Sequence, residues 1–294
     1  DVLVRLARLD AETAETVGDV SLYGRAEEAV TAALALRPDD PDARTVLALV
    51  ELERGRTERA LSERLRVIAT SPGHAPAYDG LAYLFKNTGL WAEALAMQAR
   101  AGALDPAYAH SIRQLSVFIH QDRLDDARAE AEARLARRPD YAHSIYWRGI
   151  VEIYAGDPAA AGAWIRRGYE RDPEDQIAQG VLAEWEALHG DRARARTLLA
   201  AAEPGAPADG TFSYWIAKIY AALGEPGSAV LWLGRAEDLG YWNAPWIEKD
   251  PTLDGLRAFA PFRERLLSIR ARYESFRALA HGSAALASLL RPVR

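Results

Sequence analysis

The sequence predicts an all-α fold: a right-handed α-solenoid of about seven helix-turn-helix units, followed by C-terminal capping helices. Three observations predict it. Prolines recur at a nearly constant spacing, small residues keep the same phase between them, and alanine is abundant, with 58 of the 294 residues. Alanine favours helices and lets neighbouring helices approach closely, and self-similarity with a period of about 34 residues is typical of helical repeat arrays.

The period is carried by six prolines: Pro38, Pro72, Pro106, Pro139, Pro173 and Pro207. Their spacings are 34, 34, 33, 34 and 34 residues. Proline cannot continue a helix, so each one marks the turn after the second helix of a unit. We expect a repeat array over residues 1–240, with units that end near residues 38, 72, 106, 139, 173, 207 and 241. Residues 241–294 are expected to form a terminal Trp-rich turn and capping helices.

Each unit also carries a frame of small residues. One unit reads Gly55, Ala60, Val67 and Pro72, and the same spacing returns in most of the others. The glycine stands where the chain reverses between two helices and where a positive φ is often needed. The alanine stands where a longer side chain would push the two helices apart. Such a helical pair cannot bury its apolar stripe alone, so we expect the pairs to stack on one another.

One unit departs from this frame, the one that ends at Pro139. It is one residue short and has Asp122 and Arg134 at the glycine and small positions, so we expect a slightly distorted stack there. The motif AYAHSI at 107–112 returns as YAHSI at 141–145. We interpret it as the trace of a copied unit, which places the two motifs at equivalent positions of consecutive first helices.

The period and the frame resemble the tetratricopeptide repeat, whose unit is a helical hairpin of about 34 residues. The resemblance covers residues 8 to 240, and segments 81–106 and 216–240 are similar to ordinary members. The segment 241–273 resembles the terminal segment of many bacterial tetratricopeptide proteins, which we expect to cover the exposed face of the last repeat. Its matching residues are Trp242, Trp246, Leu253, Asp254, Leu256, Arg257, Pro261 and Phe262.

Composition argues against several function classes. The chain has no cysteine, which excludes disulfides and thiolate metal sites, and its net charge of −6 disfavours binding to a phosphate backbone. No apolar run is long enough to span a membrane. Two arginine clusters, at 54–66 and 192–196, are interleaved with glutamates or followed by acidic segments, so we interpret them as solvated helix faces. The same interpretation is given to six carboxylates: Glu27, Glu28, Asp125, Asp126, Glu130 and Glu132.

No catalytic motif is present in the sequence, neither a nucleophile elbow nor a phosphate-binding glycine loop nor a zinc-protease helix. The sequence therefore predicts a protein without enzymatic activity and without a cofactor or metal. His110 and His143 could converge on a metal if they occupy equivalent places about 10 Å apart in adjacent first helices. A metal site normally needs three or four ligands, so histidines that are exposed or that face a partner are the favoured interpretation.

By resemblance, the concave surface of the array holds a partner peptide. Aromatic, histidine and basic side chains in helical spacing on the first helices are expected to face it, and such residues are typical of binding hot spots. The same spacing would also suit Trp147, Tyr154 and Trp215 as gap fillers between helices, and both interpretations stay open. The two-lysine, two-asparagine clamp of chaperone-binding members is missing. The candidate partner-binding residues are Tyr83, Lys86, His110, Arg113, His143, Tyr146, Trp147, Tyr154, Tyr214, Trp215 and Lys218.

The first functional hypothesis is a non-enzymatic protein–protein interaction scaffold that binds a peptide or helix of a protein partner in this groove. The alternative is a regulatory or sensor region of a larger bacterial signalling protein, such as a Ser/Thr kinase, a cyclase or a winged-helix regulator, with a further domain before Asp1. A third hypothesis is an enzyme whose site lies around Trp242, Trp246 and Asp250. We expect the cytoplasm by default; the sequence does not indicate the oligomeric state or which protein is bound.

Overall fold

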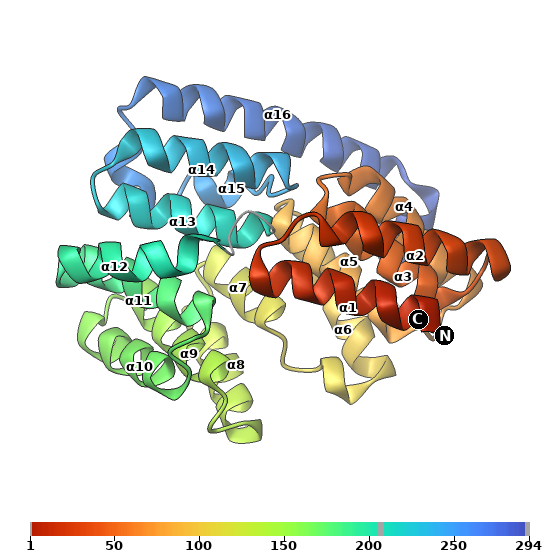
Figure 1. Cartoon of the computed structure of the whole chain (residues 1–294), viewed down its shortest axis with the longest axis horizontal. Coiled ribbons are helices and arrows are strands. Elements are labelled where there is room, and N and C mark those ends of the chain that lie inside the picture. Colours follow the sequence, from red (N-terminus) through yellow and green to blue (C-terminus); the bar gives the residue numbers. More distant parts are fainter. Residues whose placement is uncertain (1, 205–208, 292–294) are drawn as a thin grey trace.

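The structure is a computed structural model that describes residues 2–204 and 209–291. Within these two ranges the chain forms helices joined by short turns, and no β-strand, which confirms the predicted all-α fold (Figure 1). Pro207, the sixth proline of the period, lies outside the described residues. So do Asp1, at the start of the expected array, and residues 292–294, at the end of the expected capping region.

Helices α1 to α14 form consecutive hairpins, in each of which an odd-numbered first helix packs against an even-numbered second helix. The first helices are α1 (Val2–Val17), α3 (Pro41–Glu53), α5 (Ala75–Asn87), α7 (Ile112–His120), α9 (Ala142–Ala155), α11 (Gln176–His189) and α13 (Gly210–Ala222). The second helices are α2 (Leu22–Leu36), α4 (Thr57–Thr70), α6 (Trp91–Leu104), α8 (Leu124–Arg137), α10 (Pro158–Arg171), α12 (Arg192–Ala202) and α14 (Pro226–Asp238).

The starts of several helices follow directly from the sequence. Asp40 caps α3, because its Oδ1 accepts a hydrogen bond of 3.0 Å from the backbone N–H of Ala43, and Pro41 occupies the first helical position. Asp157 and Pro158 start α10 in the same way. Aspartates also cap α11, α12 and α13. Capping aspartates, joined in α3 and α10 by a proline at the first helical position, therefore fix where these helices begin.

Small residues set the distance between the two helices of a hairpin. The alanine of the frame is buried in every copy that has one: Ala26, Ala60, Ala94, Ala127, Ala161, Ala195 and Ala229. The turn between the helices has a positive φ at Gly55 and Gly156, as expected, with values of 73° and 77°. Asp122 takes this place between α7 and α8 with a φ of 59°, so the irregular unit makes the same turn at a greater cost.

The repeated AHSI motif adopts two different structures, so the prediction of equivalent places for His110 and His143 is wrong. In the second copy, Ser144 and His143 lie inside α9. In the first copy, Ser111 caps α7 by accepting a hydrogen bond from the backbone N–H of Arg113, and His110 precedes the helix with a φ of 57°. The short 3₁₀ helix η1 (Pro106–Tyr108) occupies the start of this shortened unit, and α7 therefore begins later.

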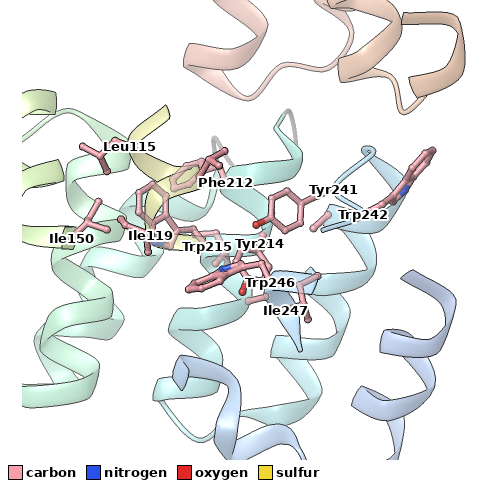
Figure 2. Close-up of a cluster of buried hydrophobic side chains, with 14 of the residues drawn as sticks. Leu115, Ile119, Ile150, Phe212, Tyr214, Trp215, Tyr241, Trp242, Trp246 and Ile247 are labelled. Atoms are coloured by element: carbon pink, nitrogen blue, oxygen red, sulfur yellow. The ribbon is translucent and has the colours of Figure 1, made fainter. Parts of the chain in front are cut away.

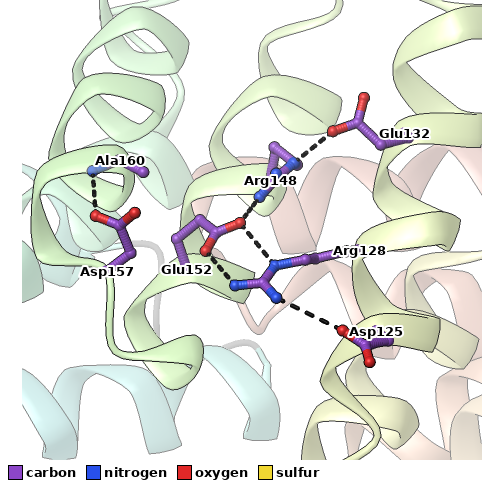
Figure 3. Close-up of polar contacts among 7 residues, drawn as sticks. All are labelled: Asp125, Arg128, Glu132, Arg148, Glu152, Asp157 and Ala160. Atoms are coloured by element: carbon purple, nitrogen blue, oxygen red, sulfur yellow. Dashed lines mark hydrogen bonds and ion pairs between the residues drawn. The ribbon is translucent and has the colours of Figure 1, made fainter.

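The joint between α8 and α9 is held by an ion-pair network (Figure 3). Glu152 on α9 is buried and pairs with Arg148 on its own helix and with Arg128 on α8, whose Nη2 lies 2.9 Å from Glu152 Oε2. Arg148 also reaches Glu132 on α8, at 2.7 Å. The hydrogen bonds from Arg128 hold the pKa of Glu152 below its ordinary value, so the carboxylate stays charged and ties the two hairpins together.

After α14 the chain forms the short helices α15 (Ala244–Ile247) and η3 (Pro251–Leu256), the long helix α16 (Ala260–Gly282) and α17 (Ala284–Leu289). Helix α16 lies along α14, as Figure 1 shows at the top of the molecule. The buried Glu237 of α14 joins them, because it accepts hydrogen bonds from Arg265 at 2.7 Å and from Arg272 at 3.0 Å. Gly282 is the last residue of α16.

The C-terminal region also returns to the early hairpins, which no pattern in the sequence indicated. The backbone N–H of Trp242 donates to the carbonyl of Asn87 at 3.0 Å, and Asn243 Nδ2 donates to the carbonyl of Lys86 at 3.2 Å. Farther along the chain, Arg100 on α6 donates to the carbonyl of Leu289 at 2.5 Å. We call the contact of residues 238–250 with α4, α5, α7 and the turns that adjoin them the closure. Buried apolar side chains from Leu52 to Leu286 accordingly form one continuous core.

Candidate functional site

The inner surface of the molecule is formed mainly by the first helices, and side chains of α5 and of the start of α13 divide it into two compartments. Both are lined by side chains that helical spacing brings to the same side of successive first helices. The larger compartment lies at the N-terminal hairpins and is called here the N-terminal cleft. The smaller one, called the inner cavity, lies between α5, α7, α9, α13 and the segment around α15.

The N-terminal cleft has a volume of about 350 Å³. Helices α1, α3, α4, α5 and α7 line it together with η1 and the residue before α13. Its lining is aromatic and basic. It includes the rings of Tyr83 and Tyr108 and the guanidinium groups of Arg8, Arg64 and Arg113.

Arg64 differs from Arg113 in its burial and in its lack of an ion pair. Its side chain is only 3% exposed, its Nε atom has no hydrogen-bond partner, and no carboxylate oxygen of the described residues lies within 4.0 Å, although Asp79 and Glu53 lie near enough to favour its charge. By contrast, Arg113 lies 2.8 Å from Asp79 Oδ1. Burial lowers the pKa of Arg64 to about 10, so the group stays charged at neutral pH. Its guanidinium occupies the space opposite Gly80, where a Cβ atom would come within 1.5 Å of Arg64 Nη1.

The two compartments are separated by side chains of α5 and of the start of α13. The Tyr83 hydroxyl donates to Asp209 Oδ2 over 3.5 Å, and Lys86 Nζ donates to Thr211 Oγ1 over 3.3 Å. Lys86 Nζ also lies 4.9 Å from the centre of the Tyr83 ring. This partition keeps Tyr83 in the cleft and Lys86 in the cavity.

The inner cavity is small, about 60 Å³, and its walls are mainly aromatic and aliphatic. Figure 2 shows Trp215, Tyr214, Ile119 and Ile150 among the side chains that α13, α7 and α9 contribute, with Trp246 from α15 below them. The residues that line it are Lys86, Ser116, Ile119, His120, Trp147, Ile150, Tyr154, Thr211, Tyr214, Trp215, Lys218, Tyr241 and Trp246.

A hydrogen-bonded network fixes the far wall of this cavity. Lys218 Nζ lies 2.8 Å from Glu184 Oε1 and donates to the Tyr154 hydroxyl at 2.9 Å. The indole N–H of Trp215 donates to the other Glu184 oxygen at 2.8 Å. Because a buried charge is costly unless it is paired, this network keeps Lys218 in place.

Lys86 on the opposite wall has no such partner. It is 6% exposed, and no carboxylate oxygen of the described residues lies within 4.0 Å of its Nζ atom. Burial lowers the pKa of Lys86 to about 8, since few groups nearby compensate its charge. At neutral pH the cavity thus contains a cation that still has donors to offer.

Comparison with known proteins indicates the kind of repeat. A profile of the tetratricopeptide repeat (TPR) matches residues 18–75 and 113–176. These two segments, less than half of the chain, are similar to the TPR family. No curated protein sequence matches it significantly.

Solved structures agree with the TPR fold at low sequence identity. A tetratricopeptide repeat protein from Parabacteroides merdae has a TM-score of 0.54 and 17% identity, with 90% of this chain and 98% of that chain covered. The APC/C hetero-tetramer Cut9–Hcn1 gives 0.55 and 15%, with 95% and 55% covered. A human IFIT1 dimer solved with PPP-AAAA gives 0.53 and 12%, with 87% and 69% covered. These structural similarities show that the chain has the fold of a TPR solenoid.

The TPR structure places most of the predicted site residues on the inner surface. Tyr83 and Arg113 line the N-terminal cleft. Six residues come together at the inner cavity: Lys86, Trp147, Tyr154, Tyr214, Trp215 and Lys218.

Three other predicted site residues lie in neither compartment. His110 Nδ1 lies 3.0 Å from Glu130 Oε2 on α8. His143 stacks on Tyr141, with ring centres 5.6 Å apart. Tyr146 is completely buried against α10, so it contributes to the packing of that hairpin and presents no surface.

Two predictions about charged residues are corrected by their burial. Arg64 is not part of a solvated helix face, because it lies on the buried stripe of α4 together with Ala60 and Val67. Glu130 is also buried, and burial raises its pKa although the partner His110 works against this. The signal that sequence reasoning missed was the helical spacing of Arg64 from Ala60 and Val67, which are small or apolar residues of the repeat frame.

Two general findings complete the site. In residues 2–204 and 209–291, no helix combines the length and the apolar character that a membrane span requires. In the same part of the chain, no three His, Asp or Glu side chains are grouped as metal ligands would be.

Proposed function

We propose that this protein is a non-enzymatic scaffold that binds a segment of a partner protein in the N-terminal cleft, with an acidic side chain of the partner on Arg64. The observation that carries the proposal is the buried, charged and unpartnered guanidinium on the wall of a cleft of about 350 Å³. Helical repeat arrays use such concave surfaces for extended partners.

The chemistry of the cleft favours a carboxylate. A guanidinium without a partner in a partly desolvated site gains most from a planar anion that accepts two hydrogen bonds. The other cations of the cleft are already engaged, since Arg113 pairs with Asp79 and Arg8 lies 4.0 Å from Asp42. The rings of Tyr83 and Tyr108 offer flat, amphipathic surface beside it, which is typical of peptide-binding hot spots.

The inner cavity does not serve this function, because 60 Å³ is too little for a peptide. The proposal therefore assigns partner binding to Tyr83 and Arg113 and assigns the six cavity residues to a different role. The regulatory-region hypothesis stays a prediction, and the sequence that surrounds residues 1–294 in its gene would test it.

An array of immobilised 12-residue peptides tests the function. Peptides that contain Glu or Asp are paired with otherwise identical peptides that contain Gln or Asn. The wild-type protein is expected to retain acidic peptides at least tenfold better than their amide counterparts. The variant Arg64→Met should lose this preference, because it removes the charge and keeps much of the length of the side chain.

Arg196→Met is the matched control, since Arg196 is exposed on α12 and pairs with Glu225. It should bind peptides as the wild type does. Equal retention of acidic and amide peptides by the wild type, or equal losses in the two arginine variants, would refute the proposal.

A further inference from the structure

The walls of the inner cavity carry hydrogen-bond donors that lack acceptors. Lys86 Nζ carries three N–H donors, and its hydrogen bond to Thr211 Oγ1, at 3.3 Å, is a long one. The indole N–H of Trp147 is buried and has no partner among the described residues. The Ser116 hydroxyl also lines the cavity and makes no hydrogen bond to another described residue. A ligand that only accepts hydrogen bonds would satisfy these donors.

The charge of the cavity walls also favours a ligand that accepts hydrogen bonds. The chain has three lysines. Lys218 is paired with Glu184 and Lys249 with Asp122, and Lys86 alone has no carboxylate within 4.0 Å in the described part of the chain. An aromatic cage could hold a cationic ligand, but an uncompensated ammonium in the wall repels cations. The ligand that fits is therefore an anion.

The small size of the cavity favours a small anion. Its volume of about 60 Å³ is well below the roughly 150 Å³ of a cavity that admits benzene. A carboxylate with a short alkyl chain is smaller than an aromatic acid and therefore suits this cavity better.

The walls favour an organic anion over an inorganic one. Ile119 and Ile150 are almost fully buried and line the cavity, and the rings of Trp147 and Trp215 lie 5.8 Å apart beside them. These surfaces contribute apolar contact that chloride or phosphate cannot use. The lining residues Trp147, Tyr154 and Thr211 are only half-buried, which places the entrance of the cavity beside them.

We propose that the inner cavity binds a short-chain carboxylate of two to four carbons, whose carboxylate accepts hydrogen bonds from Lys86 and whose alkyl chain packs on Ile119 and Ile150. The proposal is independent of the peptide-binding function, because it uses a different compartment and a different cation.

Sodium propionate is the probe, and tryptophan fluorescence at pH 7 is the readout, since Trp147, Trp215 and Trp246 line the cavity. Propionamide is the neutral control of the same shape, and sodium chloride keeps the ionic strength constant. Propionate is expected to give a saturable change, and propionamide to bind at least tenfold more weakly. This comparison is made on the wild-type protein and requires no variant to fold.

Lys86→Met then tests the assignment of the cation, with unfolding by circular dichroism as the check that the variant is folded. It should weaken propionate binding at least tenfold. Lys249→Met is the matched control, because Lys249 also lies near the Trp246 ring but outside the cavity lining, and it should bind propionate normally. Arg64→Met should also bind propionate normally, which separates this test from that of the peptide site.

Three results would overturn the proposal. They are indistinguishable titrations with propionate and propionamide, unchanged binding in Lys86→Met when that variant is folded, and full competition by chloride at the concentration of propionate.

Discussion

His120 shows how one residue of the inner surface couples the fold to pH. Its imidazole ring is buried and stacks on Trp246 of the closure, with ring centres 4.5 Å apart. Burial lowers the pKa of His120 well below its ordinary value, and the positive charges of Lys86, Lys218 and Lys249 lower it further. The folded protein therefore keeps this histidine neutral at pH values where an unfolded chain would protonate it.

We predict that the free energy of unfolding decreases as the pH falls below about 6.5, the ordinary pKa of histidine. Above this pH both states hold the ring neutral, and its contribution is zero. Below it only the unfolded state takes up the proton, so each such histidine costs about 1.4 kcal/mol per pH unit. Urea unfolding between pH 7 and pH 5 measures the slope, and His120→Phe should reduce it by one proton.

His143 provides an internal reference, because burial lowers its pKa to about 3 and its proton uptake remains in the variant. His281→Gln is the control, since this residue is half exposed at the end of α16 and pairs with Glu93. A slope for His120→Phe equal to that of the wild type would contradict the prediction.

Helical spacing groups Trp147, Tyr154 and Trp215 on the first helices, either on the inner surface or as gap fillers between helices. The structure places all three around one cavity. Sequence reasoning failed for Arg64, because alternation of Arg and Glu in the local sequence suggested a solvated face. The spacing of Arg64 from Ala60 and Val67 indicated its burial, and Gly80 of the neighbouring helix leaves the room that the guanidinium occupies.

At the scale of elements, close approach of α9 and α10 depends on glycine. A Cβ atom at Gly168 of α10 would lie 2.8 Å from Tyr146 Cβ and 2.9 Å from the backbone nitrogen of Tyr146. Backbone atoms cannot move aside as the end of a side chain can. We predict that Gly168→Ala separates the two helices and lowers the free energy of unfolding by about 1–3 kcal/mol, as overpacked cores do.

Gly24→Ala is the control for this substitution, because Gly24 lies in α2 and no heavy atom lies within 4 Å of the place that an added methyl group would take. There alanine should raise stability by about 0.4–1 kcal/mol, through the lower entropy of the unfolded chain. If both substitutions changed the free energy of unfolding equally in urea, the contact between α9 and α10 would not explain the effect at Gly168.

The elements themselves were largely predictable, because the repeat frame fixes them. Small residues, turn glycines and capping aspartates act over a few residues, and all are visible in the sequence. The two AHSI motifs mark the limit of this reasoning. His110 and His143 have the same neighbours in sequence, and they differ in structure because the unit before Pro139 is one residue short.

At the scale of the whole molecule, the closure can be tested with two turn glycines. Gly55 and Gly156 occupy the same place in their hairpins and have φ values of 73° and 77°. A Cβ atom at Gly55 would lie 2.0 Å from the carbonyl oxygen of Asp238, whereas a Cβ atom at Gly156 would have no heavy atom within 4 Å. Alanine at either position costs about 1–2 kcal/mol for the left-handed backbone.

We predict that Gly55→Ala loses more stability than Gly156→Ala, by about 1–3 kcal/mol, because it also displaces the closure. Hydrogen exchange should become faster in residues 238–250 of Gly55→Ala and stay unchanged there in Gly156→Ala. Unchanged exchange in both variants, together with equal losses in urea unfolding, would mean that the contact at Asp238 does not hold the two ends together.

The closure could not be predicted from the sequence. The position of the last hairpin depends on small rotations between successive hairpins, which add up over the array. No local pattern records that sum. Trp246 was expected to serve a capping segment or, in the third hypothesis, an enzyme site. Nothing near it in sequence indicated that it would meet His120, more than a hundred residues earlier.

The closure restricts the insertions and deletions that the protein can accept. An open array tolerates the gain or loss of a unit, because each unit touches only its neighbours. Here one inserted or deleted hairpin would carry Trp246 and Asn243 away from α5 and α7, and the inner cavity would lose the wall that Tyr241 and Trp246 form. We therefore expect related proteins that keep the closure to have the same number of hairpins.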